Sequence, residues 1–307
     1  MKKSIIVLMI FVLVIGMLAG CSSSEAPVEE VTAEDLTVGF VYVGPIGDGG
    51  WTYAHDQGRL ELEEALGVNT IYVESVPDSD ASIESEIRNM VDQGAEVIFA
   101  TSFGYMDHVE KLSKEYPEVT FFHCSGYKQT ENMANYFGRM YEPRYLSGIV
   151  AGMKTETNKI GYVAAFPIPE VIRGINAFTL GVKSVNPDAE VEVVWTSTWY
   201  NPATEKEAAV SLLDSGADVI TQHQDTVGPQ QAAEERGAYS IGYNTDMREM
   251  APEAYMTAPV WHWGPYYIEQ VQKVIDGDFE AHSYWGGLDD EIVALDDLTA
   301  LAPEGAK

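Results

Sequence analysis

Basic residues are scarce in this 307-residue chain. It contains 18 Lys and Arg against 48 Asp and Glu, which gives a formal net charge of −30 at pH 7. Nucleic acids and anionic membrane surfaces are bound largely through Lys and Arg, so this balance excludes both as partners recognised by charge. Solubility at a cell surface, including one at high ionic strength, explains the acidic excess without a functional role.

Long apolar runs are absent except at the start of the chain. A lysine pair precedes the run at 4–18 (SIIVLMIFVLVIGML), which is too short for an ordinary membrane-spanning helix and has the flanks of a signal peptide. The LAGC at 18–21 resembles a bacterial lipobox, and the Ser-rich tail after Cys21 favours lipidation over simple secretion. We therefore predict a signal peptide at 1–20 and a diacylated Cys21 that anchors the protein to the membrane.

Cysteine is also scarce. The chain has two, and with Cys21 assigned to lipid, Cys124 has no disulfide partner and is predicted to be a small buried residue at a strand end. Residues 21–35 show no apolar periodicity and are predicted to form the flexible, lipid-anchored tether. Roughly 270 residues remain after Leu36, enough for two ordinary domains.

Motifs for metal, nucleotide or nucleophile chemistry are missing. The six histidines show no HxxxH or HExxH spacing, and the Gly-rich run at 44–51 (GPIGDGGW) is not a GxGxxG fingerprint. Asp48 inside this run would repel a phosphate. His223 lies near Asp225, but no GxSxG elbow accompanies them. We predict no metal, no cofactor and no catalytic residue, and a hydrolase acting through His223 and Asp225 is the weakest alternative.

The chain does contain a regular alternation of short β-branched and aromatic runs with helical stretches. Strands that alternate with helices of ten to fifteen residues are typical of βαβ units, and so of parallel sheets covered by helices on both faces. Strands are predicted at Leu36–Val43, Thr70–Ser75, Val97–Phe103, Val119–Cys124, Ile160–Ala165, Val191–Thr196, Val219–His223 and Tyr239–Tyr243.

The pattern occurs twice. The two half-chains, 36–137 and 159–243, share a helix–Gly–acid–Val–Ile joint, written DQGAEVIFATS at 92–102 and DSGADVITQHQ at 214–224. We therefore predict an α/β protein made of two doubly wound parallel-sheet lobes, joined by a hinge that the chain crosses several times.

Three segments are predicted to cross between the lobes. They are 139–144, 254–260 and a third near 281–287. The predicted lobes, with the ligand cleft between them, are 36–140 plus about 261–281 for lobe 1 and 141–260 plus about 282–307 for lobe 2.

The carboxyl ends of the predicted strands define candidate binding loops, because ligands of open parallel sheets bind in the crevice outside those ends. The loops offer aromatic rings, carboxylates and amides, and the candidate ligand-binding residues are Asp48, Trp51, Tyr53, Tyr105, Asp107, Phe166, Trp199, Gln224, Asp225, Asn244 and Asp246. An Asp just after a strand is as often a helix N-cap or a turn former, and a Trp there can be a core residue. The convergence of five loops favours a site.

These loops contain no lysine, and Arg248 is the nearest arginine. A crevice of rings and acids should reject phosphate and carboxylate ligands and favour a flat, donor-rich ring or a cation. Trp51 from one lobe and Trp199 from the other are positioned to sandwich a planar ligand, and stacking on an aromatic side chain is worth about 1–3 kcal/mol per nucleic-acid base. Carboxylates would accept hydrogen bonds from its N–H groups.

Several segments resemble the basic membrane protein family of bacterial ABC-transporter solute-binding lipoproteins, which includes purine nucleoside receptors. The resemblance runs from about Leu36 to Gly287, and the segments that carry it are VGFVYVGPIGDGGWTYAHDQGR, TSFGYMDHV, EPRYLSGIVAG, IPEVIRGINAFTLGVKSVNP and GPYYIEQVQKVIDGDF. It implies a type I periplasmic-binding-protein fold, capture of a purine between two lobes and delivery to an ABC permease.

The resemblance also implies roles for individual residues. Asp48 and the stacking Trp51 match a D-x-S-F-N segment of the nucleoside binders, with Thr52 in place of the Asn. Trp199 falls at the family's second stacking position. Two further acids, Asp107 and Asp246, match acids that follow strands in the family.

The chain departs from the family pattern in two places, and the first of them refines the expected ligand. Nucleoside binders place a ribose-contacting lysine in the segment occupied here by Val260–Trp263, and the GDxGWTYxHDxxR pattern is more similar to a subgroup that binds free nucleobases such as adenine. Relatives also usually continue with another helix beyond the position of Lys307.

The sequence therefore predicts a monomeric, extracytoplasmic lipoprotein that captures a purine nucleobase for an ABC permease and is not an enzyme. A purine nucleoside receptor and an aromatic cage for a cationic ligand such as a quaternary amine are the alternatives.

Overall fold

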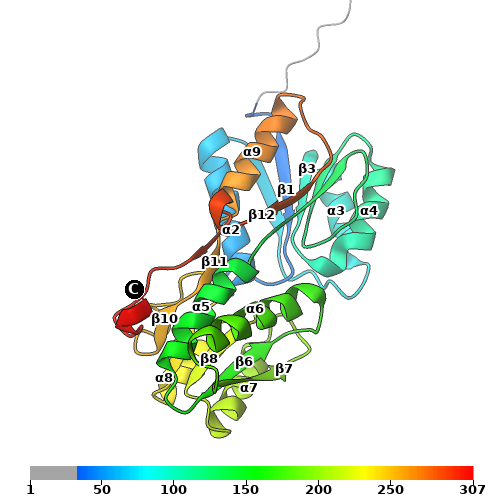
Figure 1. Ribbon diagram of the computed structural model, residues 1–307. Coiled ribbons are helices and arrows are strands. Elements are labelled where there is room, and N and C mark those ends of the chain that lie inside the picture. Colours follow the sequence, from blue (N-terminus) through cyan, green and yellow to red (C-terminus); the bar gives the residue numbers. More distant parts are fainter. Residues whose placement is uncertain (1–32, 307) are drawn as a thin grey trace, which may run out of the picture. The chain divides into compact units, whose positions relative to one another are not determined.

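The computed structural model describes residues 33–306 (Figure 1). The predicted signal peptide, the lipidation site Cys21 and the tether up to residue 32 lie outside the described residues. Within 33–306, no helix combines the length and the apolar character needed to cross a membrane.

Six parallel strands form the first sheet, in the order β12-β5-β4-β3-β1-β2 (Figure 1). Their bounds are β1 Thr37–Val41, β2 Asn69–Val73, β3 Ala95–Ala100, β4 Thr120–Cys124, β5 Met133–Gly138 and β12 Ser283–Gly286. Successive side chains of a strand point to opposite faces, and the core divides accordingly. Phe40 packs with residues of α2 (Trp51–Leu66) and α9 (Gly264–Ile275), whereas Val41 packs with residues of α3 (Ser82–Asp92) and α4 (Met106–Glu115).

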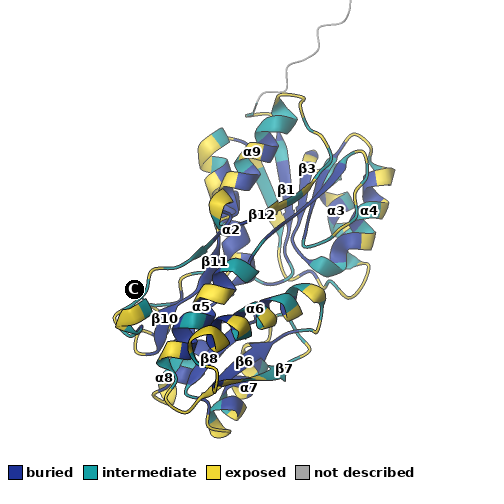
Figure 2. Cartoon of the chain, viewed as in Figure 1, coloured by how far each residue is buried: buried dark blue, intermediate teal, exposed yellow. Residues whose placement is uncertain are grey.

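Five parallel strands form the second sheet, in the order β10-β9-β8-β6-β7. Their bounds are β6 Lys159–Ala164, β7 Glu190–Trp195, β8 Val219–His223, β9 Tyr239–Ile241 and β10 Tyr255–Thr257. Tyr162 of β6 packs with residues of α5 (Tyr141–Lys154) and α6 (Pro169–Val185), while Val163 packs with residues of α7 (Pro202–Asp214) and α8 (Gly228–Glu235). In Figure 2 both sheets are largely buried and the outer faces of the helices are exposed. Two parallel sheets with helices on both faces confirm the predicted α/β architecture.

Helices α5 and α6 approach each other so closely that glycine is required at the contact. A Cβ on Gly148 would lie against the carbonyl oxygen of Phe178, and a Cβ on Gly181 would lie against that of Tyr145. The two helices bring their backbones together here, which no side chain would allow.

The links between the sheets differ from the prediction in one place. Strand β11 (Pro259–Trp261) leaves the second sheet after β10 and pairs antiparallel with β13 (Val293–Leu295). The third crossing was predicted near 281–287, with lobe 2 resuming at about 282. That boundary is wrong, because Ser283–Gly286 form β12 and pair with β5 of the first sheet. The chain leaves the first sheet after Gly286, through a short 3₁₀ turn at Leu288–Asp290.

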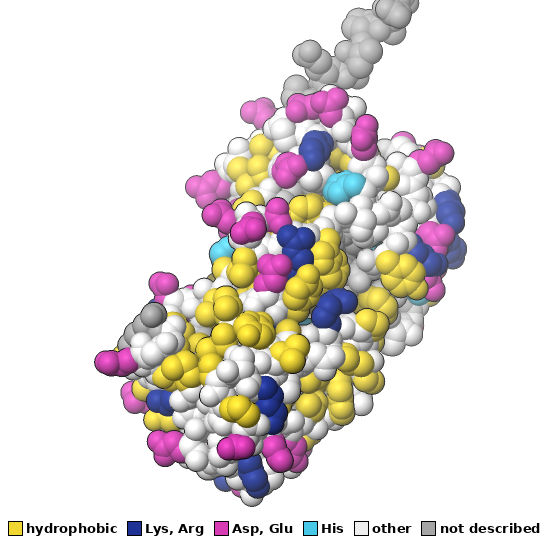
Figure 3. Space-filling model, viewed as in Figure 1, with side chains coloured by type: hydrophobic (Ala, Val, Ile, Leu, Met, Phe, Trp, Pro, Cys, Tyr) yellow, Lys and Arg dark blue, Asp and Glu magenta, His cyan; other side chains and the backbone are white. Residues whose placement is uncertain are grey.

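Two further 3₁₀ turns complete the described elements. Phe103–Tyr105 lead into α4, and Glu304–Ala306 lie at the end of the described chain. On the face shown in Figure 3, acidic side chains are spread over the surface, while hydrophobic ones gather where α5 and α6 lie in Figure 1. Leu180 of α6 is 64% exposed there.

Candidate functional site

A cavity lies between the carboxyl ends of the two sheets. The space between its side chains amounts to about 330 Å³ when counted to the solvent at its mouth. The ten residues that line it come from both lobes: Val43, Trp51, Ser102, Phe103, Ser125, Glu170, Trp199, His223, Asp225 and Tyr243. Among these described residues are four aromatic rings, two carboxyl groups and no lysine or arginine.

Trp51 begins helix α2 and is fixed on several sides. Its indole N–H donates to the carbonyl oxygen of Thr101 at 2.7 Å, and its ring is 8% exposed. The ring meets those of Trp261 and Trp263 edge-on, with centroid distances of 5.9 and 5.8 Å. A ring held in this way presents one fixed edge and face to the cavity.

Trp199 enters the cavity from the loop after β7. Its ring packs edge-on against Phe166, with centroids 5.2 Å apart, and lies 6.4 Å from the ring of His223. Trp199 is only partly buried and lines the cavity, whereas Phe166 supports it from behind.

Asp48 holds the loop that precedes α2. Its Oδ1 accepts hydrogen bonds from the backbone N–H groups of Gly50 and Tyr53 at 2.8 and 2.9 Å, and its Oδ2 accepts one from Thr52 at 2.9 Å. Burial raises the pKa of this carboxyl to about 6 even though these donors oppose the shift. Asp48 lies beside a neighbouring surface hollow and does not line the cavity, so its carboxylate is committed to the loop.

Asp225 is the buried carboxyl group that does face the cavity. It is 4% exposed, and its Oδ2 has no hydrogen-bond partner among residues 33–306. Burial raises the pKa of Asp225 well above its usual range, and the nearby carboxylates of Asp48, Glu205 and Glu170 raise it further. Asp225 can therefore act as a hydrogen-bonding group for a ligand in either protonation state.

A second set of polar side chains lies around the imidazole of His223. Its Nε2 lies 3.3 Å from the Tyr243 hydroxyl and 3.7 Å from Oε1 of Glu170. Glu170 also accepts a hydrogen bond from the Ser125 hydroxyl, which belongs to the other lobe. Burial lowers the pKa of His223 to about 4, so the imidazole is neutral at neutral pH.

The structure places four of the predicted ligand-binding residues away from the cavity. Tyr53 is 40% exposed on α2. Tyr105 is fully buried in the core of the first lobe, where its hydroxyl donates to the carbonyl oxygen of Val76 at 2.6 Å. Asp107 is exposed on α4 and pairs with Lys128 at 2.9 Å, and Asp246 pairs with Arg248 at 2.7 Å.

Two predicted amide side chains, Gln224 and Asn244, are buried behind the cavity. Gln224 donates to the hydroxyl of Thr196 and to the carbonyl oxygen of Thr198, in the loop that carries Trp199. Asn244 adopts a left-handed backbone with φ 72° and accepts a hydrogen bond from the indole N–H of Trp261 at 3.1 Å. Both position their neighbours and do not line the cavity.

Seven of the ten lining residues are not among the predicted ligand contacts. Val43 ends the predicted first strand, Ser102 and Phe103 end the predicted third, and Ser125 follows β4. Glu170 lies in the first turn of α6. The rule that ligands bind beyond strand ends would have found Ser125, had the loop after β4 been included.

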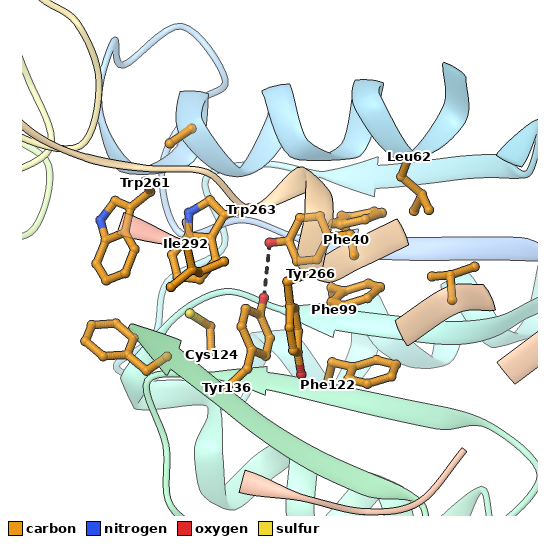
Figure 4. Close-up of a cluster of buried hydrophobic side chains, with 14 of the residues drawn as sticks. Phe40, Leu62, Phe99, Phe122, Cys124, Tyr136, Trp261, Trp263, Tyr266 and Ile292 are labelled. Atoms are coloured by element: carbon orange, nitrogen blue, oxygen red, sulfur yellow. Dashed lines mark hydrogen bonds between the residues drawn. The ribbon is translucent and has the colours of Figure 1, made fainter. Parts of the chain in front are cut away.

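The segment Val260–Trp263 fills space behind Trp51. The indole of Trp261 stacks on that of Trp263 with centroids 4.4 Å apart, and both belong to the core of the first lobe (Figure 4). Neither ring lines the cavity. In the part of the chain that the structure describes, no three His, Cys, Asp or Glu side chains are grouped so as to hold a metal ion.

Comparison with known proteins places this geometry in context. The family described as PnrA-like ABC-transporter substrate-binding proteins matches residues 36–305. A purine-binding protein of Brucella abortus is 43% identical over 297 residues, covering 94% of this chain and 82% of that protein. A putative ABC-transporter glucose-binding protein of Haloferax volcanii is 43% identical over 265 residues, covering 86% of this chain and 67% of that protein.

A solved structure supports the fold. An ABC-transporter solute-binding protein from Aeropyrum pernix superposes with a TM-score of 0.77 at 23% sequence identity, covering 85% of this chain and 76% of that one. The predicted type I periplasmic-binding-protein fold is thereby confirmed.

Proposed function

Because the chain belongs to the family of PnrA-like ABC-transporter substrate-binding proteins, we propose that it captures a purine nucleobase, adenine first among them, and delivers it to an ABC permease. The cavity carries this proposal. It offers the rings of Trp51 and Trp199 from opposite lobes and the carboxyl groups of Glu170 and Asp225. Planar rings favour a flat heteroaromatic ligand, and carboxylates accept hydrogen bonds from its N–H groups.

Support for a free base over a nucleoside comes from the segment Val260–Trp263. The indole of Trp261 is packed into the core of the first lobe, and a Cβ on Gly138 would come within 2.5 Å of that ring. The family resemblance implies a ribose-contacting lysine in this segment, whereas residues 260–263 of this chain are Val, Trp, His and Trp. A free nucleobase has no ribose and therefore needs no such lysine.

We further propose that the mature protein is a monomer held outside the cytoplasm by a lipid on Cys21. The ligand would be bound as the lobes close on it. A ligand drives closure only through better contacts in the closed state, and rings contributed by both lobes provide such contacts.

Glucose is the second candidate, because the Haloferax volcanii relative is named as a putative glucose-binding protein at the same 43% identity. Aromatic faces and carboxylates also suit a sugar. A quaternary amine remains the third candidate, since the cavity holds rings and acids and no lining cation.

A thermal-shift screen of the protein without its first 20 residues separates these candidates. Adenine, guanine, hypoxanthine, their nucleosides, glucose, choline and betaine are each added in excess. A ligand that binds only the native state stabilises it by about 2.7 kcal/mol at a hundredfold excess over Kd, which is easily detected. A shift with free purines supports the proposal, whereas a shift with glucose or choline alone contradicts it. Formation of free base and sugar from a nucleoside would instead indicate the hydrolase.

Replacement of Trp199 by Ala tests the stacking contact directly. We expect the Trp199→Ala variant to bind adenine at least tenfold more weakly in isothermal titration, because stacking of a base on an aromatic ring is worth about 1–3 kcal/mol. Trp195→Ala is the matched control, since Trp195 is 41% exposed on β7 and does not line the cavity. An unchanged affinity in Trp199→Ala would remove the stacking role.

A further inference from the structure

Three buried polar atoms lie together behind the cavity. They are Nε of Arg144 on α5, the hydroxyl oxygen of Tyr162 on β6 and Nδ1 of His223 on β8. None of the three has a hydrogen-bond partner among residues 33–306. A buried polar group without a partner destabilises the fold, so three at one place indicate that a bound partner satisfies them.

The three atoms converge on a glycine. A Cβ on Gly174 of α6 would lie 3.6 Å from Nδ1 of His223 and 3.7 Å from both the Tyr162 hydroxyl and Nε of Arg144. These are ordinary contact distances, so the packing of α6 does not require glycine here. Gly181 differs, since its Cβ would strike the backbone of α5. The missing side chain at Gly174 therefore leaves room beside three unsatisfied polar atoms.

We propose that an internal water molecule binds at Gly174, accepts hydrogen bonds from Arg144 and Tyr162, and donates one to Nδ1 of His223, which fixes His223 as the tautomer with its proton on Nε2. Internal waters typically make about three hydrogen bonds to buried polar groups that lack other partners. Arg144 and Tyr162 act here as positioning residues, because they reach the cavity only through His223.

The charge of Arg144 fixes the direction of these bonds. A guanidinium donates and cannot accept, so the water receives the Nε–H bond and can point a hydrogen at His223. The guanidinium carbon lies 3.8 Å from the centre of the Tyr243 ring, and Nη1 donates to the carbonyl oxygen of Gln222 at 2.8 Å. Arg144 is fully buried, so its charge acts on His223 with little screening and opposes a second proton on the imidazole.

The cavity side of His223 agrees with this tautomer. Nε2 faces Oε1 of Glu170 at 3.7 Å, and a carboxylate only accepts hydrogen bonds. The Tyr243 hydroxyl at 3.3 Å can accept as well as donate. An N–H on Nε2 thus has an acceptor available, while a lone pair there would face the carboxylate.

A fixed tautomer determines which ligand edge fits, and this step rests on the proposed function. His223 would present a donor beside the acceptor Glu170. Adenine carries the complementary pair on one edge, the N7 acceptor beside the N6 amino donor, whereas guanine presents two acceptors there, N7 and O6. The pair therefore favours adenine over guanine.

The tautomer is measured without any purine. Long-range ¹H–¹⁵N spectra of the ¹⁵N-labelled protein, ligand-free, distinguish a protonated ring nitrogen from an unprotonated one, and loss of the signals in His223→Gln assigns them. We expect a protonated Nε2 and an unprotonated Nδ1 for His223. A proton on Nδ1 would overturn the proposal, as would a high-resolution crystal structure with no ordered water within hydrogen-bonding distance of all three side chains.

Gly174→Ala provides the functional test. Its methyl group occupies the water's place at ordinary contact distances. Alanine also raises helix propensity, which offsets part of the stability lost with the water, so the variant should still fold. We expect the His223 nitrogen signals to shift and the preference for adenine over guanine to fall at least threefold, while Asn176→Ala, an exposed change on the same helix, leaves both unchanged. Unchanged His223 signals in Gly174→Ala would contradict the proposal.

The two proposals fail separately. If Nε2 of His223 carries the proton but the protein binds no purine, the proposed function is contradicted, while the proposed water and tautomer are supported. If the protein binds adenine but the proton lies on Nδ1, the proposed tautomer is contradicted, while the proposed function is supported.

Discussion

Asp48 and Asp225 are both buried carboxyl groups, yet they do different things. Asp48 receives three backbone N–H bonds within its own loop, and Asp225 keeps an oxygen without a partner among the described residues. An acid that caps its own loop and an acid that meets a ligand have the same sequence signature, since each follows a strand. Only the positions of the neighbouring N–H groups separate them, and these depend on how the loop folds.

The Asp225→Asn variant should raise stability at neutral pH. Burial and neighbouring carboxylates place the native pKa of Asp225 above its unfolded value. Such an acid stabilises the fold at low pH, and that stability is lost as pH rises through the native pKa. We expect the melting temperature of the variant to exceed that of the wild type at pH 8 by about 2–4 °C, the shift that 1 kcal/mol produces in a large domain. The difference should vanish near pH 4.

Thermal melts from pH 4 to 8 check this sign. Asp188→Asn, a change at an exposed carboxylate, is the control and should show no such pH-dependent difference. A variant less stable than the wild type at pH 8 would mean that the Asp225 carboxylate makes favourable contacts in the ligand-free protein.

At the level of secondary-structure elements, the close packing of α5 against α6 depends on small residues. The glycines at 148 and 181 let each helix lie against a carbonyl oxygen of the other. Within α6 itself, Gly174 and Gly181 serve different purposes, because a methyl group would strike the backbone of α5 at Gly181 but would meet only side chains at Gly174.

Gly181→Ala should destabilise the protein. The added methyl group would fall against the carbonyl oxygen of Tyr145, so α5 and α6 would have to separate. Overpacking of this kind costs typically 1–3 kcal/mol, more than the roughly 1 kcal/mol that Ala gains over Gly in a helix. Urea unfolding measures the loss, and Asn176→Ala, an exposed change on the same helix, serves as control. Equal stability of the two variants would contradict the close approach.

Secondary-structure elements whose residues show a clear sequence pattern of their own were predicted well. The predicted strand Val219–His223 has the bounds of β8, because its β-branched run directly follows the helix–Gly joint at 214–218. Strand β5 was missed: its sequence MANYFG contains Asn, Gly and Ala, which are rare in strands. Strand β12 has four residues and pairs with β5 (Ser283 with Asn135). A pairing at such sequence distance leaves no local pattern to detect.

For the molecule as a whole, a few contacts tie the lobes together in front of the cavity. The hydroxyl of Thr245, in the second lobe, donates to the carbonyl oxygen of Gly49, in the first, at 2.6 Å. Ser125 and Glu170 make a second such bond. Trp51, Trp199 and Asp225, which the sequence analysis named as candidates, line the cavity at this junction, whereas Glu170 comes from a helix that the strand-end rule does not cover.

Thr245→Val should weaken ligand binding and leave the fold intact. The substitution keeps the side-chain shape and removes a hydrogen bond that closes the lobes. A typical bond of this kind contributes about 0.5–1.5 kcal/mol, so we expect adenine affinity to fall about two- to twelvefold in titration. Thr299→Val removes a similar bond to the carbonyl oxygen of Tyr255 within the second lobe. Both variants losing affinity equally would argue against a role in closure.

The return of the chain to the first sheet has a consequence for the order of folding during synthesis. The aromatic core of the first lobe includes Tyr266, Tyr267 and Val271 of α9, and strand β12 follows at 283–286. The residues of β1 and α2 therefore emerge from the ribosome long before their partners in α9 exist. Phe40, Phe99 and Tyr136 lack the ring of Tyr267 until the whole second lobe has been made, although domains generally fold from the N-terminus as they are made. The first lobe to be made is the last to be completed.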